Sequence, residues 1–194
     1  MDATTPDHVL IAAAVAGDQH AFRLLVDRYE GLVAGTVVGM LGPGDDADDV
    51  GQETFIRLYR SLDRFRGDSA LSHYLHRIAV NLSLNALKRR RRLSMRLISR
   101  DRAPRSVPEP RTDPGAGDAW QKREHVQAAI AGLAPHHRAV VVLRMMEGCS
   151  TRETAEILKL PEGTVMSRLS RAMKELARDL SQYEPEHLWR EGRR

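Results

Sequence analysis

Apolar residues recur every three or four positions in three segments of the first half of the chain. The first segment is Phe22–Met40, and the breaker Gly42-Pro43-Gly44 follows it. The second, from about Ala47 to Ser61, begins among aspartates, which suit the positive end of a helix dipole. The third is Leu71–Leu87, which continues into the basic run Lys88–Arg92. The pattern predicts three helices.

Beyond residue 92 the apolar content falls and prolines and glycines become frequent, which predicts a flexible linker over 93–117. Helical patterning resumes near Asp118 and continues to about Ser181, and a short polar tail occupies 182–194. No segment alternates as a strand would. The expected fold is all-α, with two small helical domains over 5–92 and 118–181.

The second domain carries a helix-turn-helix pattern. Ser150 and Glu153 have capping-box spacing, so a short helix is expected to begin there. Pro161 suits the first turn of a second helix. The face of this second helix opposite its apolar residues presents hydroxyls and guanidinium groups spaced i, i+3, i+4, i+7, namely Thr164, Ser167, Arg168 and Arg171. Such a face either enters a DNA groove or is simply solvated.

Three glycines, Gly31, Gly35 and Gly39, share one face of the first predicted helix. The uncharged stretch around them, 31–44, is shorter than the roughly 20 apolar residues that a membrane span requires. We therefore expect no membrane insertion, and we expect the glycines to serve packing within a helical bundle.

The 194 residues carry a net charge of +4, which is distributed very unevenly. Residues 1–60 sum to −6, residues 61–105 to +9 and residues 106–194 to +1. An acidic block beside a strongly basic one indicates two different partners, and the basic block favours a polyanion such as nucleic acid.

An enzyme receives little support from the sequence. The single cysteine, Cys149, excludes an internal disulfide framework and a four-cysteine zinc site, and its spacing from His136 and His137 fits no zinc pattern. We expect a buried thiol, no metal, no cofactor and no small-molecule substrate. The N-terminal residues show no secretion signal, which predicts a cytoplasmic protein.

Taken together, these residues resemble the sigma factors of bacterial RNA polymerase, in the compact extracytoplasmic-function (ECF) subfamily. The first domain carries the resemblance in Ala47-Asp48-Asp49-Val50, Gln52-Glu53-Thr54-Phe55, Phe65-Arg66-Gly67, Tyr74–Ala79, Asn81 and the arginine run. The second domain carries it in Leu133–Val140, Leu143-Arg144, Glu147–Ser150, Ala155–Leu158, Gly163–Val165 and Ser167–Ala172.

The resemblance implies a promoter-specificity subunit with no catalysis of its own, held inactive by an anti-sigma factor until a stress signal. Core RNA polymerase would be bound at its clamp by Asp48, Asp49, Gln52 and Glu53. The minus-ten promoter element would be melted and captured by Tyr74, Arg77, Asn81, Lys88, Arg89 and Arg90. The minus-thirty-five element would be read, beside a contact to the polymerase flap, by Thr164, Ser167, Arg168 and Arg171.

Several positions depart from the family pattern, among them Tyr74, Val80, Asn85, Ala134 and Met166. Tyr74 keeps an aromatic face where tryptophan is usual, whereas Val80 and Met166 each remove a phosphate contact. Without the resemblance, Asn81 is read as a helix-surface amide, and the chain also fits a free-standing DNA-binding regulator or a protein-interaction module.

Overall fold

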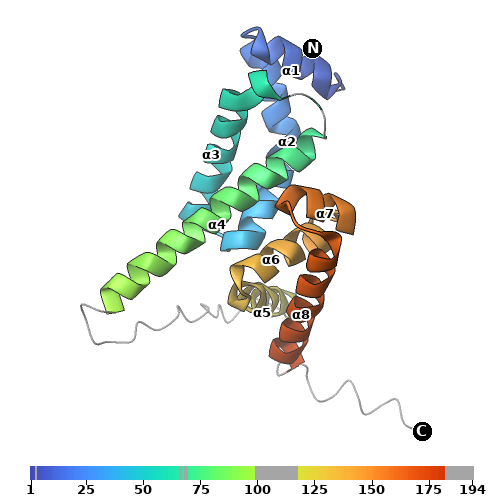
Figure 1. Ribbon diagram of the computed structural model, residues 1–194. Coiled ribbons are helices and arrows are strands. Elements are labelled where there is room, and N and C mark those ends of the chain that lie inside the picture. Colours follow the sequence, from blue (N-terminus) through green and yellow to red (C-terminus); the bar gives the residue numbers. More distant parts are fainter. Residues whose placement is uncertain (3, 66, 68–69, 99–117, 182–194) are drawn as a thin grey trace.

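The computed structural model describes the chain except residues 3, 66, 68–69, 99–117 and 182–194 (Figure 1). All regular elements in the described part are helical, which confirms the all-α fold. The first domain contains α1 (Asp7–Val15), α2 (Gln19–Leu41), α3 (Asp45–Ser61), the 3-10 turn η1 (Leu62–Arg64) and α4 (Leu71–Ile98). The second contains α5 (Asp118–Gly132), α6 (Pro135–Val141), the π-helical turn η2 (Val142–Met146), α7 (Thr151–Leu158) and α8 (Glu162–Ser181).

Helix α2 is the centre of the first domain and packs against α1, α3 and α4. Its N-cap is Asp18, whose carboxylate accepts hydrogen bonds from the backbone N–H groups of His20 and Ala21 at 2.9 and 3.1 Å. Its largest fully buried side chains, Leu25, Val33, Val37 and Met40, follow the predicted apolar spacing. The local pattern and the tertiary packing therefore agree over this helix.

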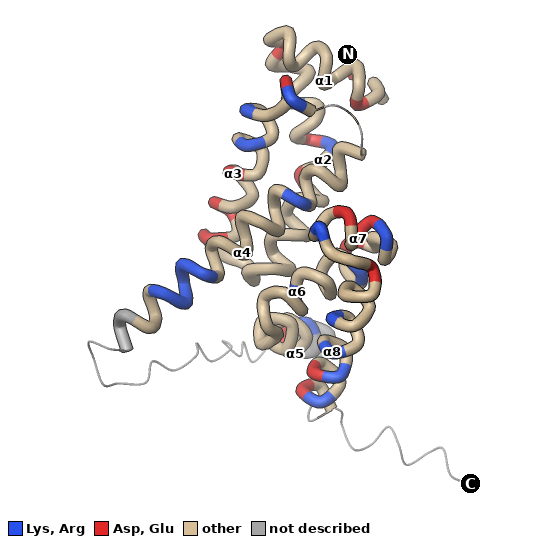
Figure 2. Tube along the Cα trace, in the orientation of Figure 1, with Lys and Arg blue, Asp and Glu red and all other residues tan. Residues whose placement is uncertain are grey.

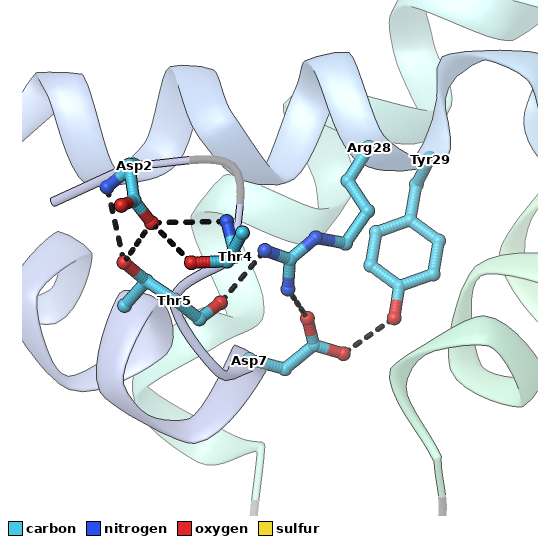
Figure 3. Close-up of polar contacts among 6 residues, drawn as sticks. All are labelled: Asp2, Thr4, Thr5, Asp7, Arg28 and Tyr29. Atoms are coloured by element: carbon cyan, nitrogen blue, oxygen red, sulfur yellow. Dashed lines mark hydrogen bonds and ion pairs between the residues drawn. The ribbon is translucent and has the colours of Figure 1, made fainter.

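A polar network fixes α1 against α2 (Figure 3). The carboxylate of Asp7 forms an ion pair with Arg28 and accepts a hydrogen bond from the hydroxyl of Tyr29. Arg28 also donates to the carbonyl of Thr5 at 2.7 Å. Burial, and then the contact with Asp7, raise the pKa of Tyr29, so the phenol keeps the proton that it donates.

The turn between α2 and α3 depends on glycine. Gly42 ends α2 with φ at 77° and Gly44 precedes α3 with φ at 128°, both in the region that L side chains rarely adopt. The acidic first turn of α3 contains Asp45, Asp46 and Asp48, as the sequence indicated.

Helix α4 is longer than the sequence predicted. It continues through the basic run to Ile98, so the predicted domain boundary at residue 92 falls inside a helix. The physical reason is that arginine is a good helix former and that basic side chains favour the C-terminal end of a helix. The rest of the predicted linker, 99–117, and the predicted tail, 182–194, lie outside the described residues.

The predicted helix-turn-helix is confirmed in α7 and α8. Ser150 accepts from the backbone N–H of Glu153 at 3.2 Å, and the Glu153 carboxylate accepts from the Ser150 N–H at 2.7 Å, which completes the capping box. Lys159, at φ 54°, ends α7 in the left-handed conformation and starts the turn. The helices bury Ala155 and Val165 against Val140 of α6.

The two domains share one apolar core. Buried side chains of α6, η2, α7 and the loop before α7 belong to the same cluster as the core of the first domain, and they are Ala139, Val142, Leu143, Ile157 and the loop residue Cys149. Gly35 and Gly39 of α2 face this second domain, since a Cβ at Gly39 would lie 2.9 Å from Val142 and one at Gly35 would lie 2.6 Å from Glu147. The close contact of these two glycines is therefore between domains, not within one bundle as expected.

Candidate nucleic-acid and protein interfaces

The acidic residues of α3 form an exposed surface. Ala47, Val50, Thr54 and Leu58 are buried, so the helical period turns Asp48, Asp49 and Gln52 to the solvent. Glu53 is half-buried and accepts from Arg57 one turn later at 2.9 Å. Three of the four predicted polymerase-binding side chains are thus accessible to a basic partner, and the fourth, Glu53, forms an ion pair with Arg57.

An apolar hollow that the sequence interpretation missed continues this surface towards the end of α3. It has a volume of about 620 Å³ and is lined by Gln19, Phe22, Phe55, Ile56, Tyr59 and Arg60. The rings of Phe22 and Tyr59 meet edge to face at 4.9 Å, and Tyr59 stays 53% exposed. The available signal was that Ile56 and Tyr59 lie off the buried stripe of their helix.

The start of α4 presents an aromatic and cationic cluster. The Tyr74 hydroxyl donates to Ser61 Oγ at 2.9 Å, and its ring lies 5.3 Å from that of Phe65. The guanidinium of Arg77 lies 5.2 Å from the centre of the Tyr74 ring, within cation–π range. Asn81 is exposed one turn further along. The cluster offers a fixed aromatic face and, beyond it, an amide.

The basic run on α4 divides into free and engaged side chains. Lys88 and Arg89 are exposed, whereas Arg90 forms an ion pair with Asp46 of α3 and donates to the carbonyl of Leu41 at 3.2 Å. Arg90 therefore already has structural partners at the junction of α2 and α3. Figure 2 shows the basic end of α4 beside the acidic start of α3.

The acidic and basic surfaces meet in a groove of about 550 Å³ between α3 and α4. Its α3 side includes Asp49, Gln52 and Glu53, and its α4 side includes Asn85 and Arg89. The structure thus places the predicted protein-binding and DNA-binding residues of the first domain on neighbouring helices.

The proposed reading face of α8 is open. Val165, Ala172 and Leu176 are buried, and Thr164 and Arg168 are half-buried at the edge of that core. Ser167 is exposed and donates to the Thr164 carbonyl at 3.1 Å, and Arg171 is exposed. Among the residues the structure describes, neither Arg168 nor Arg171 has an ion pair or hydrogen bond. Both guanidinium groups are available for phosphates or base edges.

His76 and Cys149 are buried and serve packing. His76 is 3% exposed, and its Nδ1 lies 2.9 Å from Thr36 Oγ1 on α2. Burial raises the pKa of the Cys149 thiol to about 11, so little reactive thiolate exists near neutral pH. No cluster of three or more potential metal ligands occurs within the described ranges, and none of their helices is long and apolar enough to cross a bilayer.

Comparison with known proteins identifies both domains. The family profile Sigma-70 region 2 matches residues 25–93, and the profile Sigma-70, region 4 matches residues 123–176. The chain is 36% identical to the ECF RNA polymerase sigma-E factor of Escherichia coli K12 over 187 residues, covering 86% of this chain and 90% of that protein. It is 32% identical to the RNA polymerase sigma-H factor of Pseudomonas aeruginosa, covering 90% and 93%.

Solved structures show the same architecture. CnrH in complex with the cytosolic domain of CnrY matches with a TM-score of 0.66 and 27% identity, covering 95% of this chain and 100% of that one. RpoE from Bartonella quintana, in complex with the anti-sigma factor NepR, shares the fold with a TM-score of 0.64 and 22% identity, covering 82% and 96%. Sigma factors are specificity subunits of RNA polymerase and not enzymes. The chain belongs to the ECF subfamily of RNA polymerase sigma factors.

Proposed function

We propose that α3 is the surface through which this sigma factor binds core RNA polymerase. Asp48, Asp49 and Gln52 are exposed and Glu53 lies beside them, which suits the basic coiled coil of the polymerase clamp. The apolar hollow around Ile56 extends this surface with area that a partner helix can cover. Charge steers the encounter, and the hollow adds apolar contact.

The start of α4 captures the minus-ten element in this proposal. The Tyr74 ring, fixed by Phe65 and by the Ser61 hydroxyl, offers a stacking face to an unpaired base. Stacking contributes roughly 1–3 kcal/mol per base, which helps to hold a melted strand but does not melt a whole element. Arg77 borders the ring, and Asn81 offers an amide to the hydrogen-bonding edge of a base.

Backbone contacts to the same element come from Lys88 and Arg89. Both are exposed on α4, beyond Asn81. Arg90 contributes less, because its ion pair with Asp46 must be broken before it reaches a phosphate. We therefore assign Arg90 mainly to holding the α2–α3 junction.

Helix α8 reads the minus-thirty-five element from the major groove, while the same domain touches the polymerase flap. Its N-terminal half presents Thr164, Ser167, Arg168 and Arg171 outwards. Arginine pairs with guanine edges or holds phosphates, and the two unpaired guanidinium groups suit either role.

An anti-sigma factor holds this chain inactive in the same proposal. CnrH was solved with the cytosolic domain of CnrY, and CnrH aligns with nearly the whole of this chain.

The site of action in this proposal is the cytoplasm, where core polymerase and DNA are found. The domains in this proposal are 5–92 and 118–181, and α4 itself continues to Ile98.

The observation that carries the assignment is the adjacency of an exposed acidic surface on α3 and an exposed basic surface on α4, with a helix-turn-helix in the second domain. The test is transcription in vitro from fragmented genomic DNA by core polymerase, with and without the protein, followed by sequencing of transcript starts. Starts that require the protein and share two upstream elements support the proposal. Absence of both such starts and polymerase binding contradicts it.

A further inference from the structure

A large apolar side chain is exposed in the second turn of α8. Met166 is 62% exposed, more than any other large apolar residue in the described part of the chain. It belongs to none of the apolar clusters there, and the buried stripe of α8 lies on another side of the helix, at Val165, Ala172 and Leu176. Packing within the fold therefore does not account for Met166. A lone exposed methionine is ordinary on a protein surface, so only its position can indicate a role.

Two of the helix-surface neighbours of Met166 are small. Residues three and four positions apart lie next to each other on the surface of an α-helix. Gly163 precedes Met166 by three positions, and a Cβ at Gly163 would meet nothing within 4 Å. Ser170 follows Met166 by four positions and is exposed. Met166 therefore projects beyond this part of the surface, and its unbranched side chain can adapt to an irregular partner.

The charges near Met166 differ from those on the arginine side of the helix. Glu162, one turn before Met166, is exposed and acidic. Arg171 is exposed about 140° away from Met166 around the helix axis, since an α-helix turns by about 100° per residue. A carboxylate repels phosphate, so the Met166 side of α8 is less suited to the DNA backbone than the Arg171 side. Met166 is therefore placed to meet base edges.

The chemistry of the thioether limits what Met166 can recognise. A methionine side chain has no hydrogen-bond donor, and its sulfur is only a weak acceptor. The N-terminal residues of a recognition helix meet base edges in the major groove. The apolar group that a base presents there is the C5-methyl group of thymine, and cytosine has an amino group instead. Thymine is therefore the base that suits Met166.

We propose that Met166 is a specificity-determining residue, which packs its side chain on the C5-methyl group of a thymine in the minus-thirty-five element. This inference rests on the proposed function, because it takes α8 as the helix that reads that element. Burial of one methyl group against Met166 corresponds to about a fourfold gain in affinity. The contact adds a preference for one base to the hydrogen bonds that the neighbouring polar side chains make.

Deoxyuridine tests the proposal, because it pairs as thymidine does and lacks only the methyl group. Sequencing of transcript starts first locates the minus-thirty-five element, and each thymine on either strand is then replaced in turn. Holoenzyme assembled from core polymerase and the wild-type protein is expected to bind one of these fragments about fourfold more weakly than the thymine fragment. Holoenzyme with Met166→Ala is expected to bind the same two fragments equally. Binding titrations measure both.

Met173→Ala is the matched control. Met173 is also an exposed methionine of α8, but it lies about two turns beyond Met166, in the C-terminal half of the helix. Holoenzyme with this variant is expected to keep the wild-type preference for thymine over uracil.

Three results would overturn the role of Met166: wild-type holoenzyme that binds every uracil fragment as tightly as the thymine fragment, Met166→Ala holoenzyme that keeps the wild-type preference, or an element with no thymine on either strand. Failure of the proposed function looks different. In that case, scrambling the whole element or replacing Arg168 and Arg171 leaves promoter binding unchanged. If the inference about Met166 alone fails, both of those changes still weaken binding.

Discussion

Arg90 and Arg138 both place a guanidinium at the carboxyl end of α2. Arg90 donates to the Leu41 carbonyl from α4, and Arg138 donates to the Met40 carbonyl from α6. Burial lowers the pKa of Arg138, and the nearby charge of Arg90 lowers it further, so hydrogen bonds to the carbonyls must offset the cost of desolvation. Arg90 and Arg138 are therefore basic side chains that serve the fold at the end of α2.

His76 should make stability depend on pH. Burial lowers its pKa from 6.5 to about 4, so the unfolded chain takes up the proton first and the free energy of unfolding falls as pH drops from about 6.5 towards 4. The difference between the two values corresponds to about 3 kcal/mol. Denaturant unfolding of wild type and His76→Asn across this range measures it. An equal fall of the free energy of unfolding in both proteins would show that His76 does not cause the pH dependence.

Arg168 and Arg171 should matter for the minus-thirty-five element and not for polymerase binding. Replacing either arginine with alanine is expected to weaken promoter binding by about 1–3 kcal/mol if that arginine reads a guanine edge. If the arginine holds a phosphate, the replacement is expected to reduce the salt dependence of promoter binding by about one phosphate contact. Initiation on promoters with and without that element measures the effect. Arg178→Ala, an exposed arginine in the last turn of α8, is the control. Normal initiation by both variants would show that Arg168 and Arg171 belong to a solvated helix face.

Helix α3 combines three roles along its length. Its first turn carries acidic groups that suit the helix dipole, its buried stripe packs on α2 and α4, and its exposed face changes from acidic to apolar at Ile56. The dipole explains the aspartates locally, but Asp48 and Asp49 point outwards and remain available to a partner. Both explanations of these aspartates hold at once.

The Asp48→Asn, Asp49→Asn double variant should bind core polymerase about tenfold more weakly. Exposed charge pairs contribute roughly 0.2–1 kcal/mol each, and about 1.4 kcal/mol corresponds to tenfold. The difference should shrink at high salt, because salt screens exposed charges. Binding titrations at two salt concentrations measure this, with Asp63→Asn, an exposed carboxylate on η1, as the control. Equal affinity of the double variant and wild type would refute docking through these groups.

The two domains share an apolar core, and this should show in how the molecule unfolds. Val142 and Leu143 of the second domain are buried among side chains of the first, so neither domain completes its core alone. We expect one cooperative thermal transition for the wild type and two for Gly39→Val, with Gly31→Val behaving like the wild type. Differential scanning calorimetry measures this. Two transitions in the wild type would show that the domains unfold independently.

Local sequence determined the elements of this protein. The apolar period located α2 and α3, the pair Ser150 and Glu153 set the start of α7, and the spacing on α8 placed Arg168 and Arg171 on one outward face. These features depend on residues at most a few positions apart, so they can be predicted from the sequence alone. The end of α4 was misplaced, because proline and glycine further along suggested an earlier stop.

Tertiary structure alone decided how those elements are used. It places Gly35 and Gly39 against the second domain and pairs Arg90 with Asp46. It also lets Arg138 donate a hydrogen bond to the Met40 carbonyl, 98 residues away in the sequence. The apolar hollow beside Tyr59 exists only because α2 and α3 pack side by side. Contacts between residues far apart in sequence leave no local pattern in the chain, because they form only when folding brings these residues together.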